Sequence, residues 1–383
     1  MISLAYKMLV GNKAACLGVI FGIFLATLLI AQQSAIFLGL IDRSYRMVTD
    51  IPQPTIWVMD PATENEDKLR SLPKGYLNIV RGVPEVEWAV PLNVTILPVV
   101  TPSGKFDMSL LYGIDDATLI GAPINMIEGS IMDLRHPEGV IVDKYSARET
   151  LAHVNADGSK SPLKVGNELE INGKRALVVG ICDVTRGFLP QPIIFTSLPQ
   201  FNTFTAGFAD RIGYILVKTI DGADISDVTR RINGYAELHA LTSDEVKNRI
   251  RDYFLKTGIL INFGLSVLLG LIIGFSIAGQ IFYMMTLGNI TNYALIRAVG
   301  GTKMMILKMI VFQAFLVGLI GYVLGIGVTI MWGYAIQGTT LAFLFPWQLL
   351  VFTGFIVVTI CVFTAILSIQ KVLRVDPKIL MGT

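Results

Sequence analysis

This chain of 383 residues has few charged residues. Only 16% of its residues are charged, against about 25% in an average soluble domain, while 53% are apolar. Three long segments, 14–41, 257–296 and 309–370, contain no Asp, Glu, Lys or Arg at all. A single soluble fold of this composition would expose far more apolar surface than soluble proteins do. The composition therefore all but excludes a soluble protein.

The uncharged segments are long enough to cross a membrane. A bilayer core about 30 Å thick needs roughly 20 helical residues, so the first two segments each supply one span. The third, with 62 residues, is too long for one span, and Gly338, Pro346 and the polar run 337–340 interrupt it near its middle. We expect four transmembrane helices, at about 16–41, 258–286, 306–333 and 347–370.

Basic residues gather in the short segments that flank these spans. Eight Lys and Arg face a single acid, Asp376. The eight are Lys7, Lys13, Arg297, Lys303, Lys308, Lys371, Arg374 and Lys378. By the positive-inside rule, the N-terminal segment 1–15, the segment 287–305 and the tail 371–383 are cytoplasmic, and residues 42–256 are extracytoplasmic. The first apolar run is too long for a cleaved signal peptide, so we interpret it as an uncleaved anchor.

The segment between the first two spans has the composition of a folded soluble domain. Residues 43–256 carry 23 basic and 27 acidic residues, and their single cysteine, Cys182, excludes an internal disulfide. Short β-rich runs alternate with helical runs at 65–80 and 225–238, and Asn172-Gly173 marks a hairpin. The β-rich runs are Thr55–Met59, Val86–Val100, Met108–Ile114, Gly139–Val142, Glu168–Ile181 and Ile212–Lys218. These patterns predict an inserted α+β domain.

Both connections of this domain to the membrane favour helical stalks. The run Thr242-Ser243-Asp244-Glu245 is suited to begin a helix, with an N-cap hydroxyl and acids in the first turn, and no strong breaker follows before the second span. We therefore expect one continuous helix through Tyr253 and Phe254 into that span, with a flexible linker as the alternative. Likewise, no strong breaker separates the first span from Arg46.

Several chemistries are absent from the sequence. Gly104-Lys105 and Gly173-Lys174 lack the rest of a Walker A motif, the three histidines have no metal-ligand spacing, and no Gly-x-Ser-x-Gly motif is present. The spans carry no acid or base of the kind that ion-coupled transport uses. We therefore expect no catalytic residue, metal site or cofactor in this chain, and any work it performs must draw on energy supplied elsewhere.

Glycine is frequent in the spans. The second span contains Gly270-x-x-x-Gly274, and the third contains Gly318, Gly321, Gly325 and Gly327. Small residues let helices approach closely in lipid. The pattern is compatible both with packing inside the four-helix bundle and with a face for a second copy.

The segment after the second span is the most informative. A helical run through Arg297 ends at Gly300-Gly301, a typical helix stop, and a new helix begins near Lys303. A short helix between two spans can serve as a handle for a cytoplasmic partner. It can equally be an elbow anchored by its basic residues at lipid headgroups.

Here the sequence resembles a family. Tyr293–Gly301 resembles the A-x-L-(K/R)-A-(L/M/V)-G signature of FtsX-like, MacB-type permeases of ABC transporters (type VII), which also begin with an amphipathic helix like Leu4–Lys13 and end with a basic Asp-Pro tail like 371–377. The run 253–293 and Gly82–Val86 are similar to the DevC branch, the permeases of DevBCA exporters.

The resemblance implies a homodimeric permease in the bacterial inner membrane, seated on a separate cytoplasmic ATPase dimer that binds ATP and Mg. Motion of the short helix would pass to the periplasmic domain (mechanotransmission) and expel a lipid-like or amphipathic substrate through a HlyD-like adaptor and a TolC-like outer-membrane duct. The periplasmic domain would have a porter lobe at 43–100 and 208–250 and a sabre lobe at 101–207. No nucleic acid is implied.

The same resemblance assigns contact with the ATPase to the short helix and its exit. The residues concerned are Asn292, Tyr293, Arg297, Ala298, Gly300, Gly301 and Lys303. At position 292 the family commonly carries an acid, so Asn292 departs from the pattern and docking would rely on Arg297, Lys303 and apolar contacts. The alternatives are an FtsX-like regulator of a cell-wall hydrolase and a lipoprotein-releasing permease of the LolC/LolE kind. No residue supports a membrane enzyme.

Overall fold

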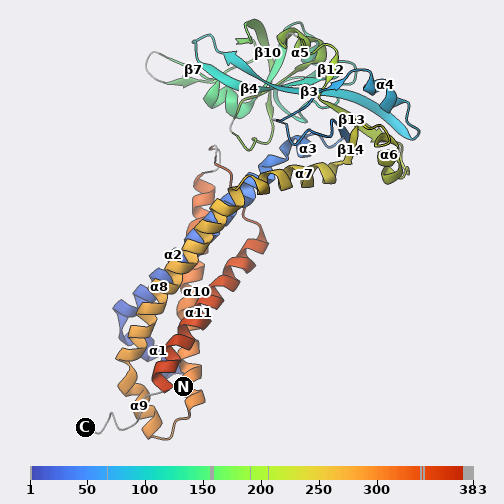
Figure 1. Ribbon diagram of the computed structural model, residues 1–383. Helices are drawn as coiled ribbons and strands as arrows, with labels where there is room; N and C mark the ends of the chain where they lie inside the picture. Colours follow the sequence, from blue (N-terminus) through green and yellow to red (C-terminus); the bar gives the residue numbers. More distant parts are fainter. Residues whose placement is uncertain are drawn as a thin grey trace. The chain divides into compact units, whose positions relative to one another are not determined.

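The computed structural model describes residues 2–66, 68–155, 159–189, 191–205, 207–336, 339 and 341–373, with side chains between 3 and 368. The chain divides into two compact units (Figure 1). The membrane unit comprises Met1–Leu40 and Gly258–Thr383, and the inserted domain comprises Ile41–Thr257. The basic tail expected at 374–383 lies outside the described residues.

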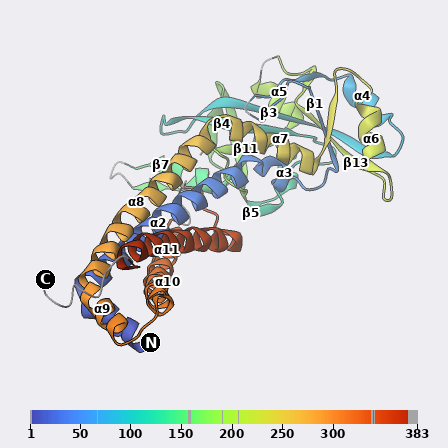
Figure 2. The same ribbon diagram turned by 60° about the horizontal axis from the view of Figure 1, so that its bottom comes forward.

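The membrane unit is helical. Within the described residues, four of its helices are long and apolar enough to cross a membrane: α2 (Lys13–Ser44), α8 (Ile259–Gly288), α10 (Lys303–Ala335) and α11 (Trp347–Leu373). Two short helices accompany them, α1 (Ile2–Gly11) and α9 (Ile290–Ala298), and Figure 2 shows α9 at the end of the bundle where the N-terminus lies. Because α2 continues to Ser44 and α10 begins at Lys303, both extend beyond the apolar segments that predicted them.

The long helices touch through small residues. A Cβ built on Gly274 would lie 2.7 Å from the Cβ of Ala26, and one on Gly321 would lie 2.9 Å from the Cβ of Ile23. A Cβ on Gly325 would lie 2.6 Å from the Cβ of Thr27, whereas Gly327 has no neighbour within 4 Å. These glycines let α8 and α10 approach α2 closely. The sequence left open whether these glycines pack inside the bundle or against a second copy. The contacts favour packing inside the bundle for Gly270, Gly274, Gly318, Gly321 and Gly325, but not for Gly327.

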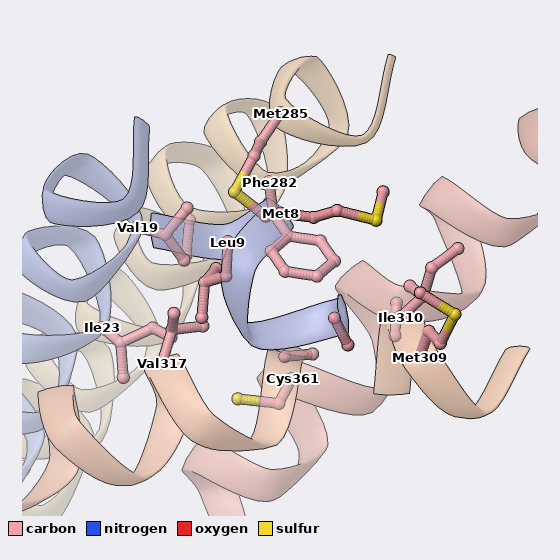
Figure 3. Packing of buried hydrophobic residues seen from close by; sticks show 14 of the residues in the cluster. Met8, Leu9, Val19, Ile23, Phe282, Met285, Met309, Ile310, Val317 and Cys361 are labelled. Carbon is pink, nitrogen blue, oxygen red and sulfur yellow. The ribbon is translucent and has the colours of Figure 1, made fainter. Parts of the chain in front are cut away.

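A buried apolar cluster fills the end of the bundle near α9. Figure 3 shows side chains from α1, α2, α8, α10 and α11 converging there. Labelled members are Met8, Leu9, Val19, Ile23, Phe282, Met285, Met309, Ile310, Val317 and Cys361. The helix α1 buries Ala5, Met8 and Leu9 in this cluster but exposes Leu4 and Tyr6. The side of α1 opposite the cluster is therefore mixed, with Leu4 and Tyr6 beside the exposed Ser3 and Lys7, which suits a position at the membrane interface.

The inserted domain is built on one mixed sheet. Ten described strands belong to it, in the order β14-β1-β13-β3-β4-β11-β6-β10-β5, with β9 paired to β10 and β3. β4 and β11 are parallel, as are β6 and β10, and the other pairs are antiparallel. The strands are β1 (Ile56–Met59), β3 (Val86–Val100), β4 (Phe106–Ile114), β5 (Asn125–Gly129), β6 (Gly139–Asp143), β9 (Glu168–Ile171), β10 (Lys174–Asp183), β11 (Ile193–Ser197), β13 (Tyr214–Thr219) and β14 (His239–Thr242).

Short elements complete the domain around this sheet. The helices are α3 (Arg46–Asp50), α4 (Tyr76–Arg81), α5 (Leu198–Phe204), α6 (Ile225–Ile232) and α7 (Ser243–Lys256), with a 3-10 turn at Ile131–Arg135 and a π turn at Ser146–Thr150. The minor strands β2 (Leu72–Pro73) and β12 (Arg211–Ile212) pair with each other, as do β7 (His153–Val154) and β8 (Lys160–Ser161). The α+β prediction is confirmed.

Two separate cores lie on this continuous sheet. The first core contains buried residues between 56 and 89 and between 212 and 240, including Val58 and Val217 on the sheet and Val228 on α6. The second core contains residues between 99 and 204, including Val142, Val178 and Phe201. Strands β3 and β4 pair from Leu92 to Val100 and join the two regions through backbone hydrogen bonds.

The hairpin prediction at Asn172-Gly173 is confirmed. Ile171 pairs with Lys174, and both turn residues have positive φ angles, 50° at Asn172 and 75° at Gly173. Two successive positive φ angles define the type I′ turn, whose twist matches that of the flanking strands.

The predicted helix over 65–80 is wrong for most of its length. Among the described residues of this range, helix occurs only in α4. Upstream, the hydroxyl of Thr63 bonds both the N–H and the carbonyl of Arg70, so that side chain competes with helical hydrogen bonding. Pro73 lacks an N–H and lies in β2 instead.

The predicted helix over 225–238 is too long. It ends at Ile232, because the side chain of Asn233 bonds both the N–H and the carbonyl of Ala240. Gly234 follows directly and disfavours continuation of the helix.

The continuous helix expected from 242 into the second span is also wrong. Thr242 and Glu245 do form a capping box at the start of α7, but α7 ends at Lys256 and α8 begins at Ile259. Gly258 between them has φ 84°, a left-handed conformation that stops an α-helix. At the other connection, α2 runs to Ser44 and only Tyr45 separates it from α3.

A buried ion pair lies at the start of the inserted domain. Arg46 is 3% exposed, and its Nη2 donates to Glu66 Oε1 at 2.9 Å and to the Tyr112 hydroxyl at 3.2 Å. The Tyr112 hydroxyl donates in turn to Glu66 Oε2 at 2.5 Å. A buried charge requires paired and hydrogen-bonded partners, and Glu66 and Tyr112 supply them here. Because Tyr112 lies on β4, these bonds attach the chain just after α2 to the sheet.

The glycine contacts make a direct prediction. Gly321→Ala would place a methyl group 2.9 Å from Ile23 Cβ and 3.0 Å from the Ile20 carbonyl oxygen, an overpacking that costs about 1–3 kcal/mol. Thermal unfolding of the full chain in detergent should therefore occur at a lower temperature. Gly327→Ala on the same helix meets no neighbour and should be neutral or stabilising. Equal unfolding temperatures for the two variants would contradict the packing argument.

Candidate coupling site

The short helix α9 is connected tightly to the span before it. α8 ends at Gly288, and Asn289 begins α9 at once. The N–H of Asn289 donates to the Thr286 carbonyl at 3.2 Å, and its side-chain amide donates to the Met285 carbonyl at 3.0 Å. These two bonds satisfy carbonyls that the end of α8 would otherwise leave unpaired. No flexible linker therefore separates α9 from α8.

The far end of α9 is closed by a Schellman motif. The N–H of Gly301 donates to the Ile296 carbonyl at 2.8 Å, and the N–H of Gly300 donates to the Arg297 carbonyl at 3.1 Å. Gly300 has φ 98°, and a Cβ on Gly301 would lie 2.6 Å from Ile296 Cγ2. The motif therefore favours glycine at both positions, for two different reasons. The expected helix stop is confirmed.

The next span begins only two residues later. The hydroxyl of Thr302 accepts from the N–H of Met305 at 3.2 Å and caps α10. Lys303 follows in the first turn of α10, where the helix dipole disfavours a positive charge. Lys303 therefore does not stabilise α10 through the helix dipole.

The buried face of α9 carries a polar group. Tyr293 is 1% exposed, and its hydroxyl donates to Gln313 Oε1 on α10 at 3.1 Å. The Gln313 amide nitrogen donates in turn to the Ala5 carbonyl oxygen on α1 at 2.8 Å. Burial raises the pKa of Tyr293 to about 12, so the hydroxyl stays protonated and remains a donor.

The other residues expected at this site lie at or near the surface. Asn292, Ala298, Gly300 and Lys303 are exposed, and Arg297 and Gly301 are half-buried. The amide of Asn292 donates to Asn289 Oδ1 at 3.1 Å. The structure thus brings these residues together on α9 and its exit, with Tyr293 alone placed underneath.

Two features of the site escaped the sequence analysis. The first is the exposed apolar pair Leu295 and Val299, which are 50% and 89% exposed. The second is a groove of about 590 Å³ between α1 and α9, lined by Lys7, Gly11, Asn12, Asn289, Asn292 and Leu295 among others. Neither feature has a signal in the sequence, because the exposure of Leu295 and Val299 and the groove both depend on how the helices pack.

This surface is suited to docking. Lys7, Arg297 and Lys303 are positive, and neither α1 nor α9 carries an acid. Among the residues that the structure describes, no group of three or more His, Cys, Asp or Glu could hold a metal ion. Exposed apolar side chains therefore lie beside cations and amides on this surface.

Four apolar helices, an inserted α+β domain between the first two, and a short helix between the second and third define a membrane permease architecture. Residues 14–235 match the MacB-like periplasmic core domain family, and residues 264–377 match the FtsX-like permease C-terminal family. The chain therefore belongs to the FtsX-like, MacB-type family of ABC transporter permeases. Its large domain lies outside the cytoplasm.

Two solved structures of transporter domains are similar to about half of this chain. The periplasmic region of MacB from Actinobacillus actinomycetemcomitans is 15% identical, with a TM-score of 0.38 over 53% of this chain and 97% of that one. The extracellular domain of the noncanonic ABC-type transporter YknZ from Gram-positive bacteria is 15% identical, with a TM-score of 0.36 over 49% of this chain and 99% of that one. Comparison with curated proteins gives no match.

The Schellman motif makes the second prediction. Valine at position 300 would have to adopt a left-handed conformation, which costs roughly 1–2 kcal/mol, whereas asparagine tolerates it. In Gly300→Val, amide exchange over 290–299 should therefore be about 5- to 30-fold faster than in the wild type. Gly300→Asn should stay close to the wild type. Mass spectrometry of peptides from this region measures both, and similar exchange in the two variants would contradict the assignment.

Proposed function

We propose that this chain is the membrane subunit of an ABC exporter and transmits ATP-driven motion from a separate cytoplasmic ATPase to its inserted domain. The observation that carries the proposal is the attachment of α9. Asn289 joins it to α8, the Gly300-Gly301 motif joins it to α10, and its buried Tyr293 bonds to α10. A force applied to its exposed face therefore reaches two membrane spans directly.

The contact with the ATPase would form on the exposed face of α9 and its exit. Arg297 and Lys303 supply charge, Leu295 and Val299 supply apolar area, and Asn292 supplies an amide where the family commonly has an acid. Gly300 and Gly301 shape the exit, Ala298 lies on the exposed side, and Tyr293 anchors the helix from below. ATP and Mg would bind to the ATPase, with no catalytic role for this chain.

The inserted domain would receive the motion. Its two cores support a division into a porter lobe, 43–100 with 208–250, and a sabre lobe, 101–207, because each core draws its residues from one of these regions or from its boundary. We further propose a homodimer that works with a HlyD-like adaptor and a TolC-like duct on a lipid-like or amphipathic substrate. The DevC-like residues in 253–293 and at Gly82–Val86 support this assembly.

The decisive experiment is gentle purification of the tagged chain from its native membrane, with mass spectrometry of the proteins recovered. An ABC ATPase together with a HlyD-like adaptor is the expected result. An ATPase together with a cell-wall hydrolase would replace the exporter with an FtsX-like regulator, and a lipoprotein carrier would replace it with a LolC/LolE-like permease. A folded preparation without any ATPase would contradict the proposal.

Charge reversal at the docking face makes the third prediction. Arg297→Glu would set a negative charge against an acidic partner surface, so stimulation of the co-purified ATPase should fall at least tenfold while the chain still folds and inserts. Ala298→Pro should have the same effect, because proline disrupts the last turn of α9. Arg297→Lys is the matched control and should retain most of the stimulation. Unchanged ATPase activity in Arg297→Glu would eliminate this docking face.

Orientation in the membrane makes the fourth prediction. We place both termini and α9 in the cytoplasm of a bacterial inner membrane and the inserted domain in the periplasm, on the charge distribution beside the spans. A reporter fused after Gly173 should be active only in the periplasm, and one fused after Asn289 only in the cytoplasm. The opposite pattern would invert the proposed orientation.

A further inference from the structure

One buried side chain connects three helices at the cytoplasmic end of the membrane unit. Gln313 on α10 is 1% exposed and uses both ends of its amide. Its oxygen accepts from the Tyr293 hydroxyl on α9 at 3.1 Å, and its nitrogen donates to the Ala5 carbonyl on α1 at 2.8 Å. Since α1 and α9 are 279 residues apart at their nearest ends in sequence, from Gly11 to Ile290, only the fold creates this link.

The chemistry of the link is specific for an amide. The Ala5 carbonyl can only accept, so the group beside it must donate, and the Tyr293 hydroxyl on the other side donates to the Gln313 oxygen. Glutamine does both in a fixed geometry. A leucine or methionine would fill the same space and satisfy neither partner.

The surroundings of the link are dry. Ala5, Met8 and Leu9 from α1 and Met309, Ile310 and Ala314 from α10 are buried in the apolar cluster that also contains Tyr293. Water cannot readily replace a hydrogen bond broken there, so breaking either bond leaves a buried polar group unsatisfied. The two bonds therefore hold α1 and α9 at fixed positions relative to α10.

We infer that Gln313 is a positioning residue that makes α1 a second moving part of the coupling device, so that ATP-driven displacement of α9 also displaces the N-terminal helix. This inference rests on the function proposed above. α1 lies directly before α2, with Asn12 alone between them, and the Asn12 side chain accepts from the N–H of Ala15 at 3.1 Å at the start of α2. The motion of α9 would thus reach the first span through α1 as well as the second and third spans directly.

The test compares wild type with two variants that remove the link. Gln313→Met keeps the length and volume of the side chain without its polar ends, and Tyr293→Phe removes a single hydroxyl. Each full-length chain is reconstituted with its co-purified ATPase, and amide exchange is measured by mass spectrometry with and without ATP plus orthovanadate. In wild type, the nucleotide should change exchange in both 290–299 and 2–11. In the two variants, the change in 290–299 should persist, and that in 2–11 should shrink at least twofold.

A matched control separates the link from the general effect of removing a buried polar group. Thr329 lies on the same helix and is fully buried, but its hydroxyl bonds only to the Gly325 carbonyl of that helix, at 2.8 Å. Thr329→Val should therefore respond to nucleotide as wild type does. A response of wild-type size in 2–11 in both Gln313→Met and Tyr293→Phe would overturn the inference. If the wild type shows no nucleotide response in 290–299, the proposed function itself fails. Failure of the inference alone leaves that response in place, so the two failures can be distinguished.

Discussion

Close contact between uncharged helices is the constraint on which the membrane unit depends. In hydrocarbon a helix satisfies its own backbone, and no hydrophobic effect drives it against a neighbour, so association depends on how closely side chains let the backbones approach. Gly274 and Gly321 provide that approach at the sides of α2. The segments 14–41, 257–296 and 309–370 carry no Asp, Glu, Lys or Arg of the kind that ion-coupled transport uses.

At the end of the membrane unit that carries α9, this short helix is firmly connected to the neighbouring spans. α9 has an exposed face with positive and apolar residues, and it is joined to its neighbours at both termini and through Tyr293. The glycines at its exit fix the turn geometry, and the apolar cluster beneath it leaves little room for independent movement.

The inserted domain shows how far local patterns extend. The strand runs and the Asn172-Gly173 hairpin were recognisable, because β-rich composition and a turn that needs positive φ are local properties. The helix predicted over 65–80 failed, since Thr63 and Pro73 favour other partners that become available only in the folded chain. Arg46 illustrates the same limit, because Glu66 and Tyr112 lie 20 and 66 residues away from it in sequence.

The sequence by itself determined the four spans, the inserted α+β domain, the charge asymmetry and the glycine stop after α9, because each depends on composition or on neighbours within a few residues. Only the tertiary structure decided the strand order, the two cores on one sheet, the break at Gly258 and the link from Tyr293 through Gln313 to Ala5. These features depend on contacts between distant residues or, at Gly258, on a backbone conformation that a glycine permits but does not require. A lone glutamine in an apolar helix has no local signature that identifies its partners.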